Sequence, residues 1–198
     1  MLSVVVQAGG ESRRMGENKA LKPFLGRPLI ERVVKRLEPV ADELLITAND
    51  PAAFDFLKLR HFPDLRPGFG PLGGLYTALA AASHPSVAVV ACDMPFASAP
   101  LVVAAAGILL QDEADVVIAE TPEGYEPMHA VYRRDSCLPA IEGAMNSGQL
   151  RVISWFPQVR VRKLTAEERS RYDPDGLAFW NLNTPEEFAQ AEQRASGR

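Results

Sequence analysis

The sequence predicts an α/β fold, a three-layer sandwich built around a mostly parallel sheet. Apolar runs rich in β-branched residues occur at 2–6, 43–47, 87–91 and 115–119, and they lack the polar alternation of half-exposed strands. Segments with helical periodicity separate these runs, as expected when helices connect parallel strands. A chain of 198 residues without a recognisable linker or repeat fits one domain over residues 1–198, with the last few residues frayed.

The first strand leads into a glycine-rich loop with basic side chains. Glycines let the backbone approach a ligand closely, so that consecutive N–H groups can form a concave anion-binding site. Arginine and lysine add positively charged donors. The residues concerned are Gly9, Gly10, Gly16, Arg13, Arg14 and Lys19. We therefore expect the loop to bind a polyphosphate.

Neither of the two common phosphate-binding motifs describes this loop. A P-loop requires Gly-Lys-Ser/Thr after its second glycine, but Gly16 is followed by Glu17 and Asn18. A dinucleotide-binding fingerprint requires G-x-G-x-x-G, which does not begin at Gly9. The loop therefore belongs to a third type of phosphate-binding loop. The alternative to a phosphate-binding loop is a glycine turn with a solvated basic face.

The next segments alternate between helix and strand. Residues 22–28 read as a short extended piece and a turn. Apolar residues recur on one face over 29–37, which predicts a helix with Pro28 at its first helical position and Pro39 after its end. After the strand at 43–47, Asp50 can cap a helix opened by Pro51.

The rest of the chain continues the alternation. A glycine-rich loop over 66–74, expected to be mobile, precedes a helix over 75–82. Two further helices are predicted over 100–110 and 136–145. Strands are predicted at 128–132, 159–164 and 178–183, in addition to the runs above. Thr184 to Glu187 forms a capping box that begins the last helix, with Pro185 at its first position.

Composition restricts the class of protein. Twenty-one Lys and Arg against 25 Asp and Glu argue against a broad nucleic-acid-binding surface. No stretch approaches the roughly 20 apolar residues of a membrane span, and the N-terminal run is too short for a signal peptide, so we expect a cytoplasmic protein. Cys92 and Cys137 lack metal-ligand spacing and are expected to be reduced thiols. The three histidines also lack such spacing, which favours surface or hydrogen-bonded roles.

Polar residues at strand ends are the candidates for chemistry. Asp93 follows a buried strand, so its carboxylate should enter the crevice where α/β sheets bind ligands, and it is the best metal ligand in the chain. Asn181 and Asn183 are two apart on the predicted strand and should share one face. The alternatives are that Asp93 caps the next helix and that Asn183 shapes the turn before the last one.

The motif Ala8-Gly9-Gly10-x-Ser12-x-Arg14-Met15-Gly16-x-x-Lys19 resembles the signature of nucleotidyltransferases that begin with a glycine-rich nucleotide loop. Within them it is most similar to the molybdenum cofactor guanylyltransferases. Gly70-Pro71-Leu72-Gly73-Gly74, Cys92-Asp93-Met94-Pro95 and the Asn-x-Asn-Thr-Pro ending at Asn181 extend the resemblance over nearly the whole chain.

The resemblance implies a Rossmann-like nucleotidyltransferase fold and transfer of GMP from GTP to the phosphate of molybdopterin, with Mg²⁺ on Asp93. Arg14, Lys19 and Asp93 would then be catalytic, and Gly74, Asn181 and Asn183 would lie on the acceptor side. The nucleotide would contact Gln7, Ala8, Gly9, Gly10, Lys19, Asn49, Asp64 and Asp93. Transient contacts with proteins that deliver or receive the cofactor are a further expectation.

Two positions depart from the family pattern, and several functions stay open. Position 7 is Gln where the family usually has Leu, and its backbone rather than its side chain is expected to meet the base. Position 18 is Asn where Asp commonly precedes the lysine. The alternatives are a cytidylyltransferase for the same pterin, a guanylyltransferase for another phosphorylated acceptor, and a non-catalytic nucleotide carrier on this fold.

Overall fold

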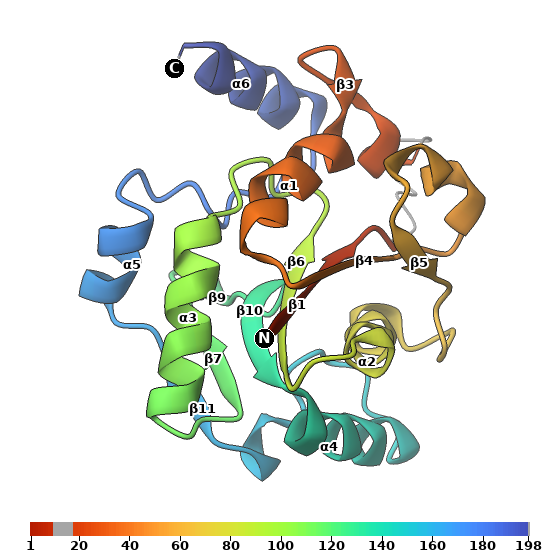
Figure 1. Cartoon of the computed structure of the whole chain (residues 1–198), viewed down its shortest axis with the longest axis vertical. Coiled ribbons are helices and arrows are strands. Elements are labelled where there is room, and N and C mark those ends of the chain that lie inside the picture. The colour runs from red at the N-terminus through yellow and green to blue at the C-terminus, as the bar shows by residue number, and fades with distance from the viewer. Residues whose placement is uncertain (10–17, 198) are drawn as a thin grey trace.

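The computed structural model describes residues 1–9 and 18–197 and contains a central sheet flanked by helices on both faces (Figure 1). Within these residues the sheet has seven strands in the order β11-β7-β10-β6-β1-β4-β5. The strands are β1 Leu2–Gln7, β4 Glu43–Thr47, β5 Arg60–Phe62, β6 Ser86–Ala91, β7 Val116–Ile118, β10 His129–Arg133 and β11 Val161–Lys163. The predicted fold class is therefore confirmed.

Strands β6, β1, β4 and β5 are neighbours and run parallel to one another. Strand β10, on the other side of β6, runs antiparallel to it. It lies between β6 and β7 and is antiparallel to both. Two short hairpins lie outside the sheet, β2 Pro23–Phe24 with β3 Arg27–Pro28 and β8 Glu120–Thr121 with β9 Gly124–Tyr125. The glycine-rich loop starts at the carboxyl end of β1, in the middle of the parallel part.

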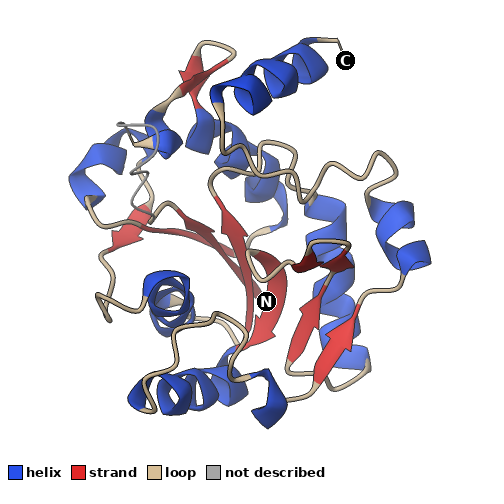
Figure 2. Cartoon of the chain, turned by 180° about the vertical axis from the view of Figure 1, so that it is seen from behind, coloured by secondary structure: helices blue, strands red, loops and turns tan. Residues whose placement is uncertain are grey.

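The helices form the two outer layers, which Figure 2 shows from behind. They are α1 Leu29–Leu37, α2 Gly70–Ala81, α3 Ala99–Gln111, α4 Arg134–Asn146, α5 Ala166–Tyr172 and α6 Pro185–Ser196, with short 3-10 helices at Lys19–Leu21, Glu38–Val40, Pro51–Leu57 and Phe156–Gln158. In the part of the chain that the structure describes, no helix combines the length and the apolar character that a bilayer crossing requires.

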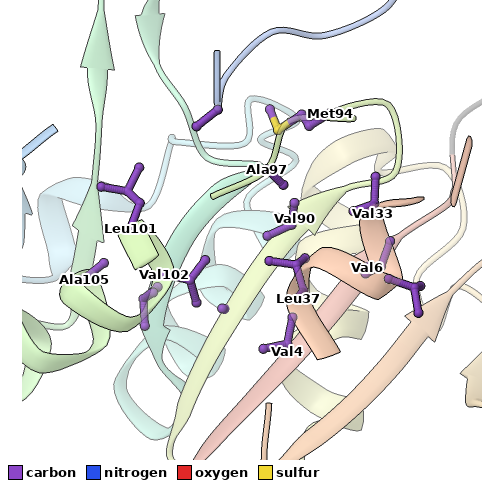
Figure 3. Close-up of a cluster of buried hydrophobic side chains, with 14 of the residues drawn as sticks. Val4, Val6, Val33, Leu37, Val90, Met94, Ala97, Leu101, Val102 and Ala105 are labelled. Atoms are coloured by element: carbon purple, nitrogen blue, oxygen red, sulfur yellow. The ribbon is translucent and has the colours of Figure 1, made fainter. Parts of the chain in front are cut away.

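Alternate residues of the buried strands build two separate cores, because successive side chains of a strand point to opposite faces. Val4, Val6 and Val90 pack with α1 and α3 on one face (Figure 3). Val5 and Val89 pack with α2 and α4 on the other face. The sequence lacks polar alternation in these runs because both faces of the sheet are covered.

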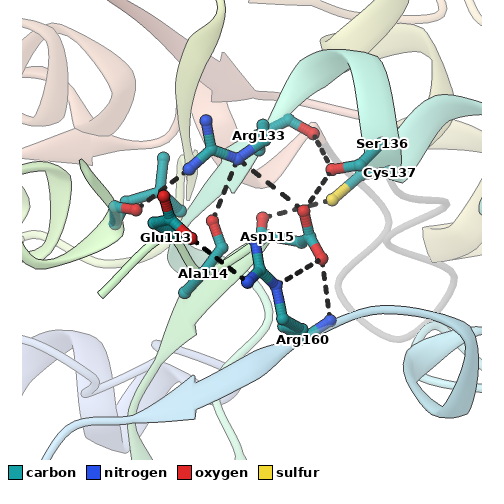
Figure 4. Close-up of polar contacts among 8 residues, drawn as sticks. Glu113, Ala114, Asp115, Arg133, Ser136, Cys137 and Arg160 are labelled. Carbon is teal, nitrogen blue, oxygen red and sulfur yellow. Dashed lines mark hydrogen bonds and ion pairs between the residues drawn. The ribbon is translucent and has the colours of Figure 1, made fainter. Parts of the chain in front are cut away.

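A polar network around Asp115, the residue before β7, connects β7 with β10 and β11 (Figure 4). The carboxylate accepts hydrogen bonds from the Ser136 hydroxyl and from the backbone N–H of Arg160, at 2.7 and 2.8 Å. Burial raises the pKa of Asp115, but these hydrogen bonds together with Arg160 and Arg133 outweigh it and hold that pKa below its usual value. Cys137 donates its S–H to the Asp115 carbonyl, and both cysteines are free thiols, as predicted.

The structure corrects several predicted elements. Residues 178–183 form turns and irregular chain rather than a strand. Helix α2 begins at Gly70, so residues 70–74 of the predicted glycine-rich loop belong to the helix. Pro28 is the residue before α1, not its first helical position, and Asp50 precedes a 3-10 helix without a side-chain capping bond. Helix α5 was not predicted, although Thr165 and Glu168 form the capping box that signals it.

Candidate functional site

Three side chains predicted from separate motifs meet in one cluster. The Lys19 ammonium donates hydrogen bonds to Asp93 Oδ2 at 2.9 Å and to Asn183 Oδ1 at 3.0 Å. The side chains of Lys19 and Asp93 are 15% and 20% exposed, so the ion pair is largely shielded from water but can be reached from it. Residues 19, 93 and 183 thus form a charged cluster just beyond the carboxyl end of β6.

Local structure holds Lys19 in place. Lys19 is the first residue of a 3-10 helix, and the Asn18 side chain caps that helix by accepting a hydrogen bond from the Ala20 N–H at 3.1 Å. Ala20 is buried against the core beneath α1. Asn18 therefore has a structural role here that an aspartate could also perform, since both side chains cap helices well.

A backbone hydrogen bond brings the C-terminal segment to Asp93. The Leu182 N–H donates to the Asp93 carbonyl at 3.0 Å. Leu182 is fully buried in a small core with Phe24, Phe96 and Phe188. This anchor directs Asn183 toward Lys19, although the segment is not the predicted strand.

Asn181 does not join the cluster, because the irregular backbone removes the shared face expected for it and Asn183. Its side chain donates to the Phe179 carbonyl at 3.2 Å and lines a second cavity of 770 Å³. Glu126, Arg169 and Trp180 also line that cavity. The prediction that the two asparagines lie on one face is wrong.

A cavity of 650 Å³ brings the other predicted residues together. Its volume lies within the range of about 300–1,000 Å³ that is usual for small-molecule sites. The lining residues are Gln7, Gly9, Thr47, Ala48, Asn49, Asp64, Pro67, Gly68, Gly70, Pro71, Gly74 and Thr77. Five of the residues expected to bind the nucleotide or the acceptor thus line one cavity, four of them at or after the ends of β1, β4 and β5 and the fifth, Gly74, in helix α2.

Gly74 lies in this cavity rather than beside Asn183. A Cβ added at Gly74 would lie 1.5 Å from Gln7 Nε2, so only glycine leaves room for the Gln7 side chain. A Cβ at Gly9 would meet no described atom within 4 Å. A side chain at position 74 would therefore displace the Gln7 amide, whereas no described atom restricts a Cβ at Gly9.

The Asp64 carboxylate is held in position by two hydrogen bonds to one of its oxygens. Oδ1 accepts from the Arg66 N–H at 2.9 Å and from the Thr77 hydroxyl at 3.1 Å. Oδ2 has no hydrogen-bond partner among residues 1–9 and 18–197, and Asp64 is one of the residues that line the cavity. Sequence reasoning missed Thr77, which looks like an ordinary helical residue, and Thr47, which ends a predicted strand without any motif.

The remaining predicted residues differ in burial and in whether the structure describes them. Ala8 is almost fully buried, and its N–H donates to the Thr47 carbonyl at 2.8 Å, which continues the ladder beyond β1. Gly10 and Arg14 lie outside the described residues. Asn49 is exposed at the cavity mouth. Cys92 contributes no nucleophile, because burial and the neighbouring Asp93 raise the pKa of its thiol far above the usual value.

The donor set at Asp93 suits a hard divalent cation. Asp93 Oδ2 and Asn183 Oδ1 converge on one cationic group, the Lys19 ammonium, which shows that the two oxygens can address a common positive charge. Magnesium is usually held by one or two carboxylates together with substrate phosphates. Among the described residues no group of three or more His, Cys, Asp or Glu could hold a metal, so a bound nucleotide would have to supply further ligands. These residues fit Mg²⁺.

The order of the strands sets the spacing across the site. Asp93 follows β6, Gln7 ends β1, Asn49 follows β4 and Asp64 follows β5, and these four strands are neighbours. Three strand spacings correspond to about 14 Å. A nucleoside triphosphate lying along this edge can therefore reach the charged cluster with its phosphates and the cavity with its base.

Comparison with known proteins identifies the family. Residues 4–161 match the model of the MobA-like NTP transferase domain. The chain belongs to the MobA-like NTP transferases. That span contains Lys19, Asp93 and every residue of the 650 Å³ cavity, and the resemblance inferred from the motifs is thereby confirmed.

Relatives within the MobA-like family are similar over almost their whole length. The molybdenum cofactor guanylyltransferase of Desulfosudis oleivorans is 36% identical over 95% of this chain and 93% of its own. The probable molybdenum cofactor guanylyltransferase of Pelotomaculum thermopropionicum is also 36% identical, over 96% of this chain and 92% of its own. The crystal structure of molybdopterin-guanine dinucleotide biosynthesis protein A from Archaeoglobus fulgidus superposes with a TM-score of 0.86 at 25% identity, covering 99% of this chain and all of that one.

Proposed function

We propose that this protein transfers GMP from GTP to the phosphate of molybdopterin and releases pyrophosphate, in a Mg²⁺-dependent reaction. The observation that carries the proposal is the convergence of Lys19, Asp93 and Asn183 next to a base-sized cavity. The names of the relatives and of the structural neighbour support the same reaction.

The reaction requires alignment and charge neutralisation rather than a general base. An oxygen of the acceptor phosphate is already anionic, attacks the α-phosphorus of GTP, and forms the new phosphoanhydride bond as the bond to the β-phosphate breaks. The electron pair leaves with pyrophosphate. Lys19 would offset the negative charge that builds on these phosphates, which is the main source of catalysis in phosphoryl transfer.

Asp93 and Asn183 would hold the metal ion beside the triphosphate. When bound, Mg²⁺ acts as a Lewis acid that stabilises charge on the phosphate oxygens. Asn183 also positions Lys19 through its hydrogen bond at 3.0 Å, and the Leu182 anchor fixes both relative to Asp93. The carboxylate and the ammonium can separate when phosphates enter, since each then gains a partner of opposite charge.

The cavity favours guanine through Asp64. Its carboxylate can only accept hydrogen bonds, and guanine offers a donor at its 2-amino group. Cytosine presents acceptors at O2 and N3, so those groups would leave the carboxylate without its full set of partners. A site that hydrogen-bonds specific donors rejects a base that lacks them.

The test is a comparison of two nucleotides with one acceptor. Purified protein is given molybdopterin, Mg²⁺ and either GTP or CTP, and the dinucleotide product and pyrophosphate are quantified. We expect GTP to be preferred by at least about 10-fold, which corresponds to roughly 1.4 kcal/mol of differential transition-state binding. Equal rates with CTP would replace the guanylyl assignment with a cytidylyltransferase, and binding of GTP without product would favour a nucleotide carrier.

A further inference from the structure

We propose that the side-chain amide of Gln7 recognises the 6-oxo edge of the guanine base. The inference rests on the proposed function, because it assigns a residue of this chain to the nucleotide that the function requires. The contact expected at position 7 is one from the backbone, so a contact from the side-chain amide goes beyond that expectation.

The floor of the 650 Å³ cavity has polar atoms without partners. In the part of the chain that the structure describes, five buried side-chain N or O atoms have no hydrogen bond, and two of them, Gln7 Oε1 and Thr47 Oγ1, belong to this floor. Gln7 and Thr47 are paired in register on β1 and β4, which places them side by side. An unpartnered buried polar group is costly, so two at one place indicate that a ligand completes the site.

The depth of these groups points to the base rather than the phosphates. Gln7 is 7% and Thr47 is 3% exposed, whereas Asn49, Gly68 and Pro71 are exposed at the mouth. Triphosphate charge belongs at the Lys19 and Asp93 cluster, on the other side of Gln7 along the strand order. A flat neutral ring that enters the cavity can reach the floor without carrying charge into it.

The backbone carbonyl of Gln7 already has a hydrogen-bond partner, so the side-chain amide is the group of Gln7 that can bind a ligand. The Gln7 carbonyl already accepts a hydrogen bond from the Cys92 N–H at 3.0 Å as the sheet edge continues beyond β6. The side chain lies against Gly74, where the absence of a Cβ leaves the space that the amide occupies. The last torsion of a glutamine is soft, so the amide can turn in that space to present its donor or its acceptor to the cavity.

A primary amide is complementary to the 6-oxo edge of guanine. Its N–H can donate to O6 and its oxygen can accept from N1–H, as amides pair with base edges in nucleic-acid recognition. Asp64, which has only acceptors, would then take the 2-amino group. Together the two residues would satisfy adjacent groups along one edge of the base.

The test compares GTP with 2-aminopurine riboside triphosphate, which keeps the 2-amino group but lacks both O6 and N1–H. Dissociation constants with Mg²⁺ are measured by calorimetry for the wild type, for Gln7→Met, which has a similar length and no hydrogen-bonding group, and for Gln7→Glu, which has only acceptors. We expect Gln7→Met to weaken GTP binding about 10-fold and Gln7→Glu to weaken it further. Binding of the 2-aminopurine nucleotide to Gln7→Met should stay within about twofold of wild type.

The outcomes separate the two proposals. If wild type prefers GTP but Gln7→Met binds GTP equally well, or loses the same factor for both purines, the role of Gln7 is refuted and the proposed function stands. If wild type prefers CTP, both proposals are refuted. Melting temperatures without nucleotide verify that each variant folds, and Gln7→Glu serves as the second variant if Gln7→Met does not.

Discussion

Replacing Gly74 with alanine tests how the cavity is built, because this glycine is the seat of the Gln7 side chain. The added Cβ would lie 1.5 Å from Gln7 Nε2 and 2.8 Å from its Cδ. The amide must therefore move by about 2 Å to reach ordinary van der Waals separation. A flexible side chain can make that movement, so we expect Gly74→Ala to fold with its amide displaced from the floor.

Two opposing effects set the expected magnitude. Alanine stabilises a helix interior by about 0.5–1 kcal/mol relative to glycine. Displacing the amide removes at least one of its two hydrogen bonds to the base, worth about 0.5–1.5 kcal/mol, so GTP affinity should fall at least about 2- to 10-fold. The variant should thus melt at or slightly above the wild-type temperature but bind GTP less tightly, which separates a local effect on the site from a loss of folding.

Gly107 provides the matched control. It lies inside α3, and a Cβ added there would meet no atom of the described residues within 4 Å, so Gly107→Ala carries the helix effect alone. We expect it to raise the melting temperature by about 2 °C, on the scale of proteins of this size, without any change in GTP affinity. Differential scanning calorimetry and titration calorimetry measure the two quantities on both variants.

The double variant Gly74→Ala with Gln7→Ala isolates the clash. Once the glutamine is gone, the methyl group at position 74 has room, so the double variant should bind GTP no more weakly than Gln7→Ala alone. Gly74 does not act through the Gln7 amide if Gly74→Ala binds GTP as tightly as Gly107→Ala does, or if the losses from Gly74→Ala and Gln7→Ala add in the double variant.

The other predictions concern the charged cluster and the pH dependence of stability. Lys19→Ala should slow pyrophosphate release at least about 100-fold, whereas Asn18→Asp, which keeps the cap, should change it less than about threefold; equal effects would mean that Lys19 is not at the phosphates. Asp93→Asn should lose most activity and respond only weakly to added Mg²⁺ in a Mg²⁺ titration of the rate, and a normal magnesium dependence would remove Asp93 from the metal site. Burial lowers the pKa of His129 from 6.5 to about 4, so its neutral form stabilises the fold above about pH 6.5 and this contribution is lost as the pH falls toward 4. Urea unfolding should show that the wild type loses about 3 kcal/mol more than His129→Gln between pH 7 and pH 4, and parallel pH profiles would contradict this.

Much of the fold could be predicted because its strands are buried on both faces. Continuous apolar runs such as Val4–Val6 mark covered parallel strands by composition alone, and the capping box at Thr184 begins α6 as predicted. Lys19, Asp93 and Asn183 were singled out because each belongs to a recognisable motif, and the structure brings the three side chains together. Local sequence also fixes the Asn18 cap that orients Lys19.

Only the tertiary structure decided which candidates lie together. The sequence placed Asn181 and Asn183 on one strand face, but the burial of Leu182 and its bond to the Asp93 carbonyl override that local pattern and send only Asn183 to Lys19. Gly74 looked like a loop residue near the acceptor, yet helix α2 carries it to Gln7, 67 residues earlier in the chain. Contacts of such sequence separation depend on how helices pack on the sheet, which no local pattern of residues encodes. For that reason the residue types of the site followed from the sequence, whereas the pairing of Gln7 with Gly74 and the support of Asp64 by Thr77 required the folded chain.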